Sequence, residues 1–546
     1  MPLMGSLYVG ASGLQTNQNA LNTTAHNMSN IDTTGYARQQ VSLSTKTYNT
    51  LSINASSVAN QQVGLGVTYS EVRQVRDYFL DQTYRKESGR SAFYEASSEA
   101  LDEVESLLGE LYGVSFSEAL DNLWEAVQEL AKTPENSVNQ GLLMQRSSEF
   151  LTSATSVYDG LNDYQDNLNL QVKEDVDRIN EIGQNLKTLN DSIRKIEIGG
   201  TENPNDLNDQ RNKLLDELSG YVNITYDEDI FGSVMVSIEG EPFVTGDMVY
   251  EMGLQQDSVS GFYTPFWPQN STYTLTNEGK KVYNIEDSKV FDITQTISSD
   301  LDTDIGGLKA RIIARGDHRA DYTDISDEAY YDSTISQSVI MNVQAEFDQL
   351  IHSVVTAING VFDTAAEPSS GYLCGEDGTP FQIFQKIASD GYDATGTYID
   401  EVTTLPETLY TIANLQINSE LTEQPSKLGF IKADGSTDQE TADALKALFT
   451  AENYNLNPNV AKKNTFTGYY SDLVSQIANS GQVYSSIVGS QKDTVAAIET
   501  ARQQVIGVSS DEELTNMIKY QNAYNAASRY INVIDEMLEH ILTALG

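Results

Sequence analysis

The segment from Ser510 to Leu545 contains neither proline nor glycine, so it is compatible with one unbroken helix. At ~1.5 Å per residue such a helix is a rod about 50 Å long. Ser510, followed three residues later by Glu513, supplies an N-cap with its reciprocal glutamate. Apolar and aromatic residues recur within the segment at alternating spacings of three and four: Met517, Tyr520, Tyr524, Ala527, Ile531, Ile534, Leu538, Ile541 and Leu545. This heptad spacing predicts a continuous apolar seam, and a rod of that length needs a partner of equal length.

The N-terminal segment repeats the same rhythm. Its seam includes Leu7, Ala11, Leu14, Leu21 and Met28. The first acidic residue is Asp32 and the first basic residue is Arg38, so no fixed charge can set the register of this helix by salt bridges. Two such seams can be covered by each other, by copies of the chain, or by the body of a globular domain. Their length favours pairing of the two termini.

The composition limits the partners. With 546 residues and 39% hydrophobic content, the chain can form the cores of about three or four domains. Its 33 basic and 79 acidic residues give a net charge of -46, which disfavours nucleic acid and anionic membranes as partners. We find no apolar run near the ~20 residues that span a bilayer, and no secretory signal at the N-terminus.

Candidate chemistry is scarce. The single Cys374 excludes a disulfide framework, and the histidines at 26, 318, 352 and 540 are too scattered to predict a zinc site. The segment from Asp227 to Gly232 begins like a calcium loop, but Phe231 and Ile238 occupy positions where ligands belong. Nucleotide-binding, metalloprotease and hydrolase motifs are missing as well. We therefore expect no catalytic residues, no metal and no cofactor, and we expect the protein not to be an enzyme.

Between the termini, helical spacing predicts helices over 78–108, over 116–130 and over 150–196, where Gly160 and Gly183 mark either kinks or close packing. A period of two begins near Ser219 and predicts strands at 234–238, 273–276 and 289–293. We also expect an extended chain or loop at 41–66, short helices at 204–218 and 441–451, a helix at 333–362, one or two strands within 402–417, and a long helical stretch from 467 through Val505 into the seam.

These segments predict an α+β multidomain fold. It has paired terminal coiled-coil helices, a bundle of long helices, an inserted β domain and a further variable region. The expected domains are 1–40 with 505–546 (the terminal coiled coil), 41–219 with 461–504 (the helical bundle), 220–332 (the β domain) and 333–460 (a helix plus a variable, loop-rich region).

Two motifs carry a resemblance to a known family. The stretch Asn27–Tyr36 (NMSNIDTTGY) resembles the N-terminal signature of the axial proteins of the bacterial flagellum, which include rod, hook and hook-associated proteins. Asp511–Leu514, Tyr520–Tyr524 and Ile534–Leu538 are similar to the C-terminal motif of the same family. The residues that match the N-terminal motif are Asn30, Thr33, Gly35, Tyr36 and Arg38.

Further features favour the hook-associated branch of that family. Gly35–Gln39 (GYARQ) resembles the variant of the motif found in that branch, and Pro204–Leu218 (PNDLNDQRNKLLDEL) resembles a segment typical of it. The order of segments, with a large helical region before the β domain, agrees. The chain departs from the family at Thr34, His26 and Asn212.

The resemblance implies a structural protein that forms the junction ring between hook and filament. Its terminal helices would self-assemble in the innermost layer of a tube after type III export without a cleaved signal peptide. The implied partners are the hook protein, a second junction protein, further copies of the chain and a cytoplasmic export chaperone. The chaperone would bind the C-terminal seam at Met517, Tyr524, Ile531, Ile534, Leu538, Ile541 and Leu545.

Three alternatives stay open. The chain could be another axial protein, such as a hook or rod protein with an enlarged insertion. It could be an axial scaffold that carries an enzyme within 363–460, for which a pocket gathering His318 or His352 with carboxylates would be the sign. It could also be a secreted adhesin.

Overall fold

A computed structural model describes residues 2–46, 49–52, 61–109, 115–199, 203–275, 281–393, 395–432 and 434–545. The chain divides into two compact units. Unit 1 comprises Met1–Gly89, Arg178–Glu251 and Gln491–Gly546, and unit 2 comprises Arg90–Asp177 and Met252–Ser490. Three long helices contribute residues to both units: α2 (Tyr78–Leu108), α4 (Ser137–Gly199) and α11 (Phe466–Ile506). Long helices with small antiparallel sheets confirm the predicted α+β class.

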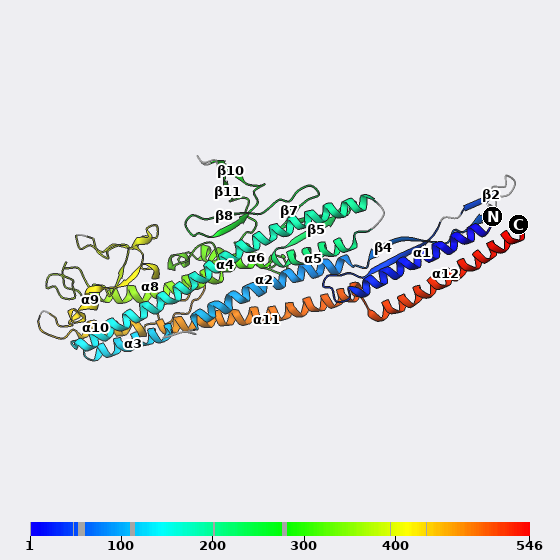
Figure 1. Cartoon of the computed structure of the whole chain (residues 1–546). Helices are drawn as coiled ribbons and strands as arrows, with labels where there is room; N and C mark the ends of the chain where they lie inside the picture. The colour runs from blue at the N-terminus through cyan, green and yellow to red at the C-terminus, as the bar shows by residue number, and fades with distance from the viewer. Residues whose placement is uncertain are drawn as a thin grey trace. The chain divides into compact units, whose positions relative to one another are not determined.

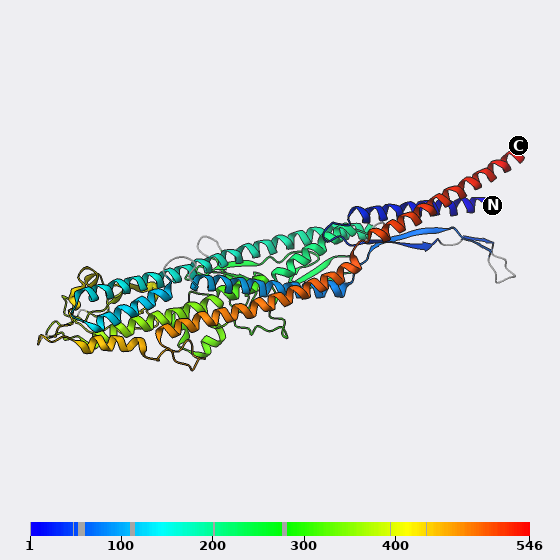
Figure 2. The same cartoon turned by 90° about the horizontal axis from the view of Figure 1, so that it is seen from below.

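The terminal helices pair within unit 1. Helix α1 (Pro2–Ser29, blue) and helix α12 (Ser510–Leu545, red) lie against each other in both views (Figure 1, Figure 2). They run antiparallel, because a side chain at Gly10 would meet Ile531 and one at Gly13 would meet Ala527.

Unit 1 also contains a β-ribbon and a small sheet. The ribbon strands β1 (Gln39–Thr45) and β4 (Val67–Gln74) pair antiparallel and lie against α1. A three-stranded antiparallel sheet, in the order β5-β6-β7, follows helix α5 (Asn205–Tyr221). The strands of this sheet are β5 (Ile224–Glu228), β6 (Val234–Ile238) and β7 (Glu241–Val244). The unit also contains β2 (Asn49–Ser52) and β3 (Gln61–Val63).

Unit 2 is built around helix α8 (Val339–Ala365). One apolar core joins α8 to α3 (Phe116–Lys132), α10 (Gln439–Thr450) and the parts of α4 and α11 that belong to this unit. At its centre the ring of Phe116 lies 4.9 Å from that of Phe347 and 4.8 Å from that of Tyr470, between centroids. Such aromatic pairs add to the burial energy.

The other elements of unit 2 are short. The helices are α6 (Gly307–Arg315), α7 (Glu328–Tyr330) and α9 (Ser419–Glu423), with 3-10 turns at Tyr322–Ile325, Pro406–Thr408, Ile412–Asn414 and Pro425–Leu428 and a π-turn at Tyr331–Ile335. The strands form two-stranded pairs: β8 (Gly253–Gln256) with β9 (Tyr263–Phe266), β10 (Thr272–Leu275) with β11 (Lys281–Asn284), and β12 (Phe384–Lys386) with β13 (Leu415–Ile417).

The two glycines inside the long predicted helix are sites of close packing. A Cβ at Gly160 would lie 2.9 Å from Leu107, and one at Gly183 would lie 2.5 Å from Phe243. Because both distances are below van der Waals contact, larger residues would push the neighbours away. Helix α4 continues through both positions from Ser137, which is earlier than the spacing from Phe150 predicted.

Three details correct the sequence predictions. The hydroxyl of Ser509, not that of Ser510, accepts the Glu512 N–H at the start of α12. The expected helix through Val505 is interrupted, because α11 ends at Ile506 and α12 begins at Ser510. The segment 289–293 forms no strand and contributes only the isolated bridge of Lys289 with Phe266, while β11 lies earlier in the chain.

Within the predicted segment 41–66, residues 41–45, 49–52 and 61–63 are strand, residues 46 and 64–66 are irregular, and 47–48 and 53–60 lie outside the described residues. The 3-10 turns at Pro406–Thr408 and Ile412–Asn414 precede the single strand β13 within the segment where one or two strands were expected.

Candidate functional site

The contact between α1 and α12 is close because small residues line α1. A Cβ at Gly10 would lie 2.7 Å from Cγ1 of Ile531, and one at Gly13 would lie 3.6 Å from Cβ of Ala527. On α1, Gly10, Thr16, Ala20, Thr24 and Asn27 are buried. Glycine at positions 10 and 13 lets the two backbones approach, at a cost of about 1 kcal/mol in helix propensity for each glycine.

The predicted N-terminal seam lies beside this buried face of α1. Leu7, Leu14, Leu21 and Met28 are partly buried, and Ala11 is exposed. Of the predicted C-terminal seam, Ile534 is buried, at 5% exposure, and Met517, Tyr524, Ile531 and Leu538 are partly buried. Ile541 is exposed, and the side chain of Leu545 lies outside the described residues.

Helix α12 carries a second apolar stripe, of which the heptad seam includes only Ile541. We call Tyr530, Val533, Met537 and Ile541 the outer stripe; their spacings of three, four and four place them on one side of the helix. Their exposed fractions range from 40% to 52%. The apolar spacing of Tyr530, Val533 and Met537 is itself the sequence signal that indicates this stripe.

The N-terminal motif, which we call the axial motif (Asn30, Thr33, Gly35, Tyr36 and Arg38), forms a tight turn after α1. Gly35 adopts φ of +84°, as a glycine after a helix end predicts. The Thr33 hydroxyl donates to Asn30 Oδ1 at 3.1 Å, and the Tyr36 hydroxyl donates to Asn27 Oδ1 at 2.8 Å. Burial, followed by repulsion from Asp206, raises the pKa of Tyr36 well above its ordinary value, so the phenol stays protonated and remains a donor.

Arg38 links this turn to the C-terminal segment. Its backbone N–H donates to the carbonyl oxygen of Ile506 at 2.8 Å, and its guanidinium lies 2.6 Å from the carboxylate of Glu512. Its own carbonyl accepts from Val75 N–H at 2.9 Å. The motif therefore joins the end of α1, the ribbon and the start of α12 at one point.

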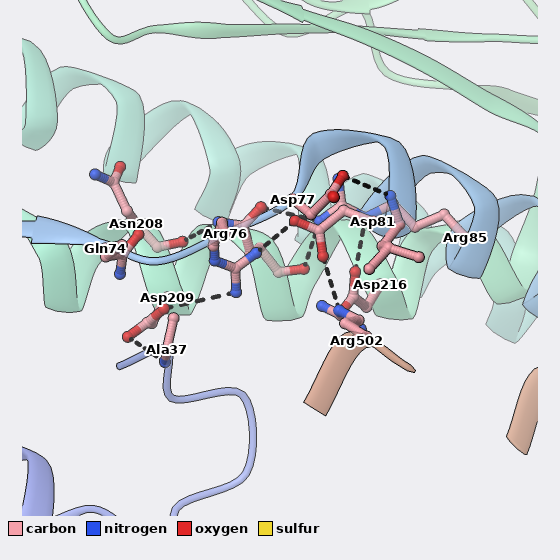
Figure 3. Close-up of polar contacts among 12 residues, drawn as sticks. Ala37, Gln74, Arg76, Asp77, Asp81, Arg85, Asn208, Asp209, Asp216 and Arg502 are labelled. Carbon is pink, nitrogen blue, oxygen red and sulfur yellow. Dashed lines mark hydrogen bonds and ion pairs between the residues drawn. The ribbon is translucent and has the colours of Figure 1, made fainter. Parts of the chain in front are cut away.

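A charged cluster lies next to this turn, and Figure 3 shows its contacts. Arg502, from the end of α11, donates to Asp81 at 2.7 Å and to Asp216 at 2.5 Å. Arg85 also donates to Asp216, at 2.7 Å, and Arg76 donates to Asp81, at 3.0 Å. We define the charged cluster as Arg76, Asp81, Arg85, Asp209, Asp216 and Arg502.

Asp209 connects the charged cluster to the axial motif. One of its carboxylate oxygens accepts the Ala37 N–H at 3.2 Å, and the other lies 3.6 Å from the Arg76 guanidinium. Burial raises the pKa of Asp209 to about 6, although the Ala37 hydrogen bond and Arg76 act in the opposite direction. Residues far apart in the chain are thus fixed together by buried ion pairs, whose disruption typically costs about 3–5 kcal/mol.

The histidines of unit 2 form carboxylate pairs. His352 lies 2.9 Å from Glu401, which also accepts the Tyr322 hydroxyl at 2.6 Å, and His318 contacts Asp317 and Asp324. Within the described residues, groups of three or more His, Cys, Asp or Glu side chains suited to a metal ion are not found. A search of the described helices for one long and apolar enough to cross a membrane finds none.

Three family models match the chain. "Flagellar hook-associated protein FlgK helical domain" matches residues 101–365, "Flagellar basal body rod FlgEFG protein C-terminal" matches 504–544, and "Flagella basal body rod protein" matches 7–36. The two shorter matches coincide with the terminal motifs found in the sequence.

Relatives of known identity align over nearly the whole chain. Flagellar hook-associated protein 1 of Bacillus subtilis is 25% identical, covering 98% of this chain and 96% of its own length. The protein of the same name from Escherichia coli is 22% identical, covering 99% of this chain and 100% of its own length. The solved structure of the flagellar hook junction protein FlgK from Burkholderia pseudomallei has a similar fold. Its TM-score is 0.53 at 13% identity, and the match covers 78% of this chain and 100% of that one.

Proposed function

We propose that this chain, which belongs to the flagellar hook-associated proteins, is a structural component of the bacterial flagellum at the junction of hook and filament. The observation that carries the proposal is the match to hook-associated protein 1 over nearly the whole chain; the paired helices α1 and α12 support it, since the N-terminal motif follows α1 and the C-terminal motif lies on α12. Such a protein acts mechanically, through the contacts that its surfaces make with neighbouring subunits.

The outer stripe of α12 supports assembly through a neighbouring copy. It is apolar and exposed in the single chain, and covering the exposed parts of its four side chains contributes roughly 3–6 kcal/mol before ordering costs. Helix α1 offers a complementary surface, because residues 2–29 contain no Asp, Glu, Lys or Arg. An apolar stripe can pack there without stripping water from a charge.

The two surfaces differ, so the contact between copies would be heterologous. α12 of one copy would contact α1 of the next, and repetition of such a contact closes a ring or extends a helical array. The N-terminal seam residues Leu7, Leu14 and Leu21, together with exposed Ala11, lie on the receiving helix. The hook protein below and a second junction protein above the ring would complete its neighbours in the axial tube.

Before assembly the same stripe would be a liability, because exposed apolar stripes promote association. We propose that a cytoplasmic chaperone covers the C-terminal helix, including Ile534, Leu538 and Ile541, until the chain passes through the flagellar type III export channel. The localisation that follows is the extracellular flagellum.

Electron microscopy of cells that lack this protein tests the junction function, with flagellin assayed in the medium. We expect complete hooks without filaments and monomeric flagellin lost to the medium. Missing hooks would instead assign the chain to the rod or hook, and normal filaments would contradict any role at the junction.

A variant tests the assembly surface directly. Replacing Val533 and Met537 with aspartate should abolish incorporation while the helix pair stays folded, since neither side chain is buried against α1. Asn532→Asp is the matched control, because it adds a carboxylate at an exposed position in the same turn. Equal incorporation of both variants into flagella would contradict the assignment of this surface.

A further inference from the structure

A second exposed apolar patch lies on unit 1, away from the residues assigned above. Ile230 and Phe231 occupy the turn between β5 and β6, and Ile198 lies in the last turn of α4. Their exposed fractions are 91%, 49% and 69%. We call Ile198, Ile230 and Phe231 the tip patch.

The two elements of the tip patch are held together by hydrogen bonds. The Asn190 side chain of α4 donates to the Val234 carbonyl at 2.8 Å and accepts the Val234 N–H at 3.1 Å. The carboxylate of Glu197 lies against Gly232, where an added Cβ would approach it to 2.1 Å. Ile198 follows Glu197 and Phe231 precedes Gly232 in the chain, so this contact brings the backbones that carry the two residues near each other.

The turn that presents Ile230 and Phe231 is rigid. Asp229 Oδ1 accepts the N–H groups of Phe231 at 2.9 Å and of Ser233 at 2.8 Å, and Gly232 adopts φ of +75°. Arg211, which is buried, donates to the Gly232 carbonyl from below. A turn fixed by its own contacts loses little entropy when it binds, so the exposed side chains are preorganised for a partner.

The charges around the tip patch select the kind of partner. Asp227 and Glu228 are exposed beside the turn, and Glu197 is half-buried. Two of the nearby bases point into the unit, since Arg211 pairs with Glu228 and Arg194 donates to the Gly246 carbonyl, while Lys195 is exposed. The tip patch of a second copy would bring the same carboxylates, so like charges would oppose the pairing of two tip patches.

We propose that the tip patch docks a segment of a different flagellar protein, one that presents an apolar ridge flanked by lysine or arginine. This inference rests on the proposed place of the chain in the flagellum. Ile230 would insert into the partner as the most exposed apolar side chain of the patch, and the carboxylates would fix its orientation.

Site-specific cross-linking in flagellated cells tests this proposal. The photoreactive amino acid p-benzoyl-phenylalanine replaces Ile230 in the full-length chain, and cross-linked peptides from purified flagella are sequenced. Val259 is the matched control position, because it is 94% exposed and lies in a similar turn where Asp257 Oδ1 accepts the N–H groups of Val259 and Ser260.

The expected result is a cross-link from position 230, lacking from position 259, to a peptide of another protein with apolar residues flanked by Lys or Arg. Loss of that cross-link in 0.5 M salt would support the charged part of the contact, with a screening length of roughly 4 Å. Cross-links only to copies of the chain, none at all, or identical products from both positions would overturn the proposal. If the chain is missing from purified flagella, the proposed function itself fails, which is a distinguishable outcome.

Discussion

Replacing Glu346 with glutamine should remove a pH dependence from the stability of unit 2. Glu346 lies on α8 and is fully buried. Its carboxylate accepts hydrogen bonds from neutral donors, Asn457 at 2.7 Å and Gln476 at 3.0 Å, and from the Tyr331 hydroxyl at 3.4 Å. Burial raises its pKa from 4.5 to about 7, although these hydrogen bonds act in the opposite direction.

The sign and size of the effect follow from linkage. Between about pH 4.5 and 7 the folded chain keeps a proton on Glu346 that the unfolded chain has lost. The free energy of unfolding therefore falls as the pH rises through this window, and it levels off above it. At about 1.4 kcal/mol per pH unit, the loss amounts to about 3 kcal/mol.

Glutamine keeps the size and one acceptor oxygen of the side chain, and rotation of the Gln476 amide restores the second hydrogen bond. Relative to the native chain, E346Q should thus gain about 3 kcal/mol of stability between pH 5 and pH 8. Asp348, which burial also shifts to a pKa of about 7, titrates in both chains and cancels in the difference.

Urea unfolding followed by tryptophan fluorescence provides the assay. The chain has two tryptophans, Trp124 and Trp267, and both belong to unit 2. Unfolding free energies of the native chain and E346Q at pH 5, 6, 7 and 8 give the difference directly. Parallel pH profiles for the two chains would refute the argument that Glu346 is protonated in the folded state.

Three further predictions concern unit 1 and its helix pair, with a comparison substitution in unit 2. Gly10→Ala should weaken the α1–α12 contact, measured by hydrogen exchange of α12, while Gly141→Ala, with open space around it, should stabilise α4 by about 1 kcal/mol. Arg502→Met should lower the free energy of unfolding of unit 1 by about 3 kcal/mol, the lower end of the usual range, because Asp81 and Asp216 each lose one of their two arginine partners; urea unfolding followed by circular dichroism measures it, and an unchanged midpoint would contradict it. Ile534→Asp with Leu538→Asp should abolish both chaperone binding and incorporation, and normal filaments in that strain would contradict it.

The long helices were the predictable part of the fold. Helix α2 has the bounds that its apolar spacing indicated, Tyr78–Leu108, because one face of a long helix must repeatedly meet the core. The strand expected at 289–293 was wrong. That segment lies between turns, and its Lys289 makes a single bridge, so alternation over five residues carried too little information.

The charged cluster could not be predicted. Arg502 pairs with Asp81 and Asp216, which lie 421 and 286 residues away along the chain. With 79 acidic residues available, sequence spacing does not select which carboxylates face a given arginine. The segment 204–218 resembles a segment of the family in its sequence. Only the structure shows that its Asp209 holds the turn after α1 by accepting the Ala37 N–H.

The two apolar stripes of α12 have different consequences for a subunit. The stripe that contains Ile534 is covered by α1 inside the same chain, so it can form before assembly. In the proposed assembly the outer stripe is covered by α1 of a neighbouring copy. A net charge of -46 keeps free subunits apart in solution, and uncharged α1 is a surface on which a stripe can pack without desolvating a charge. In the proposed assembly, the acidity of the chain therefore opposes random association while leaving the contact from α12 of one copy to α1 of the next open.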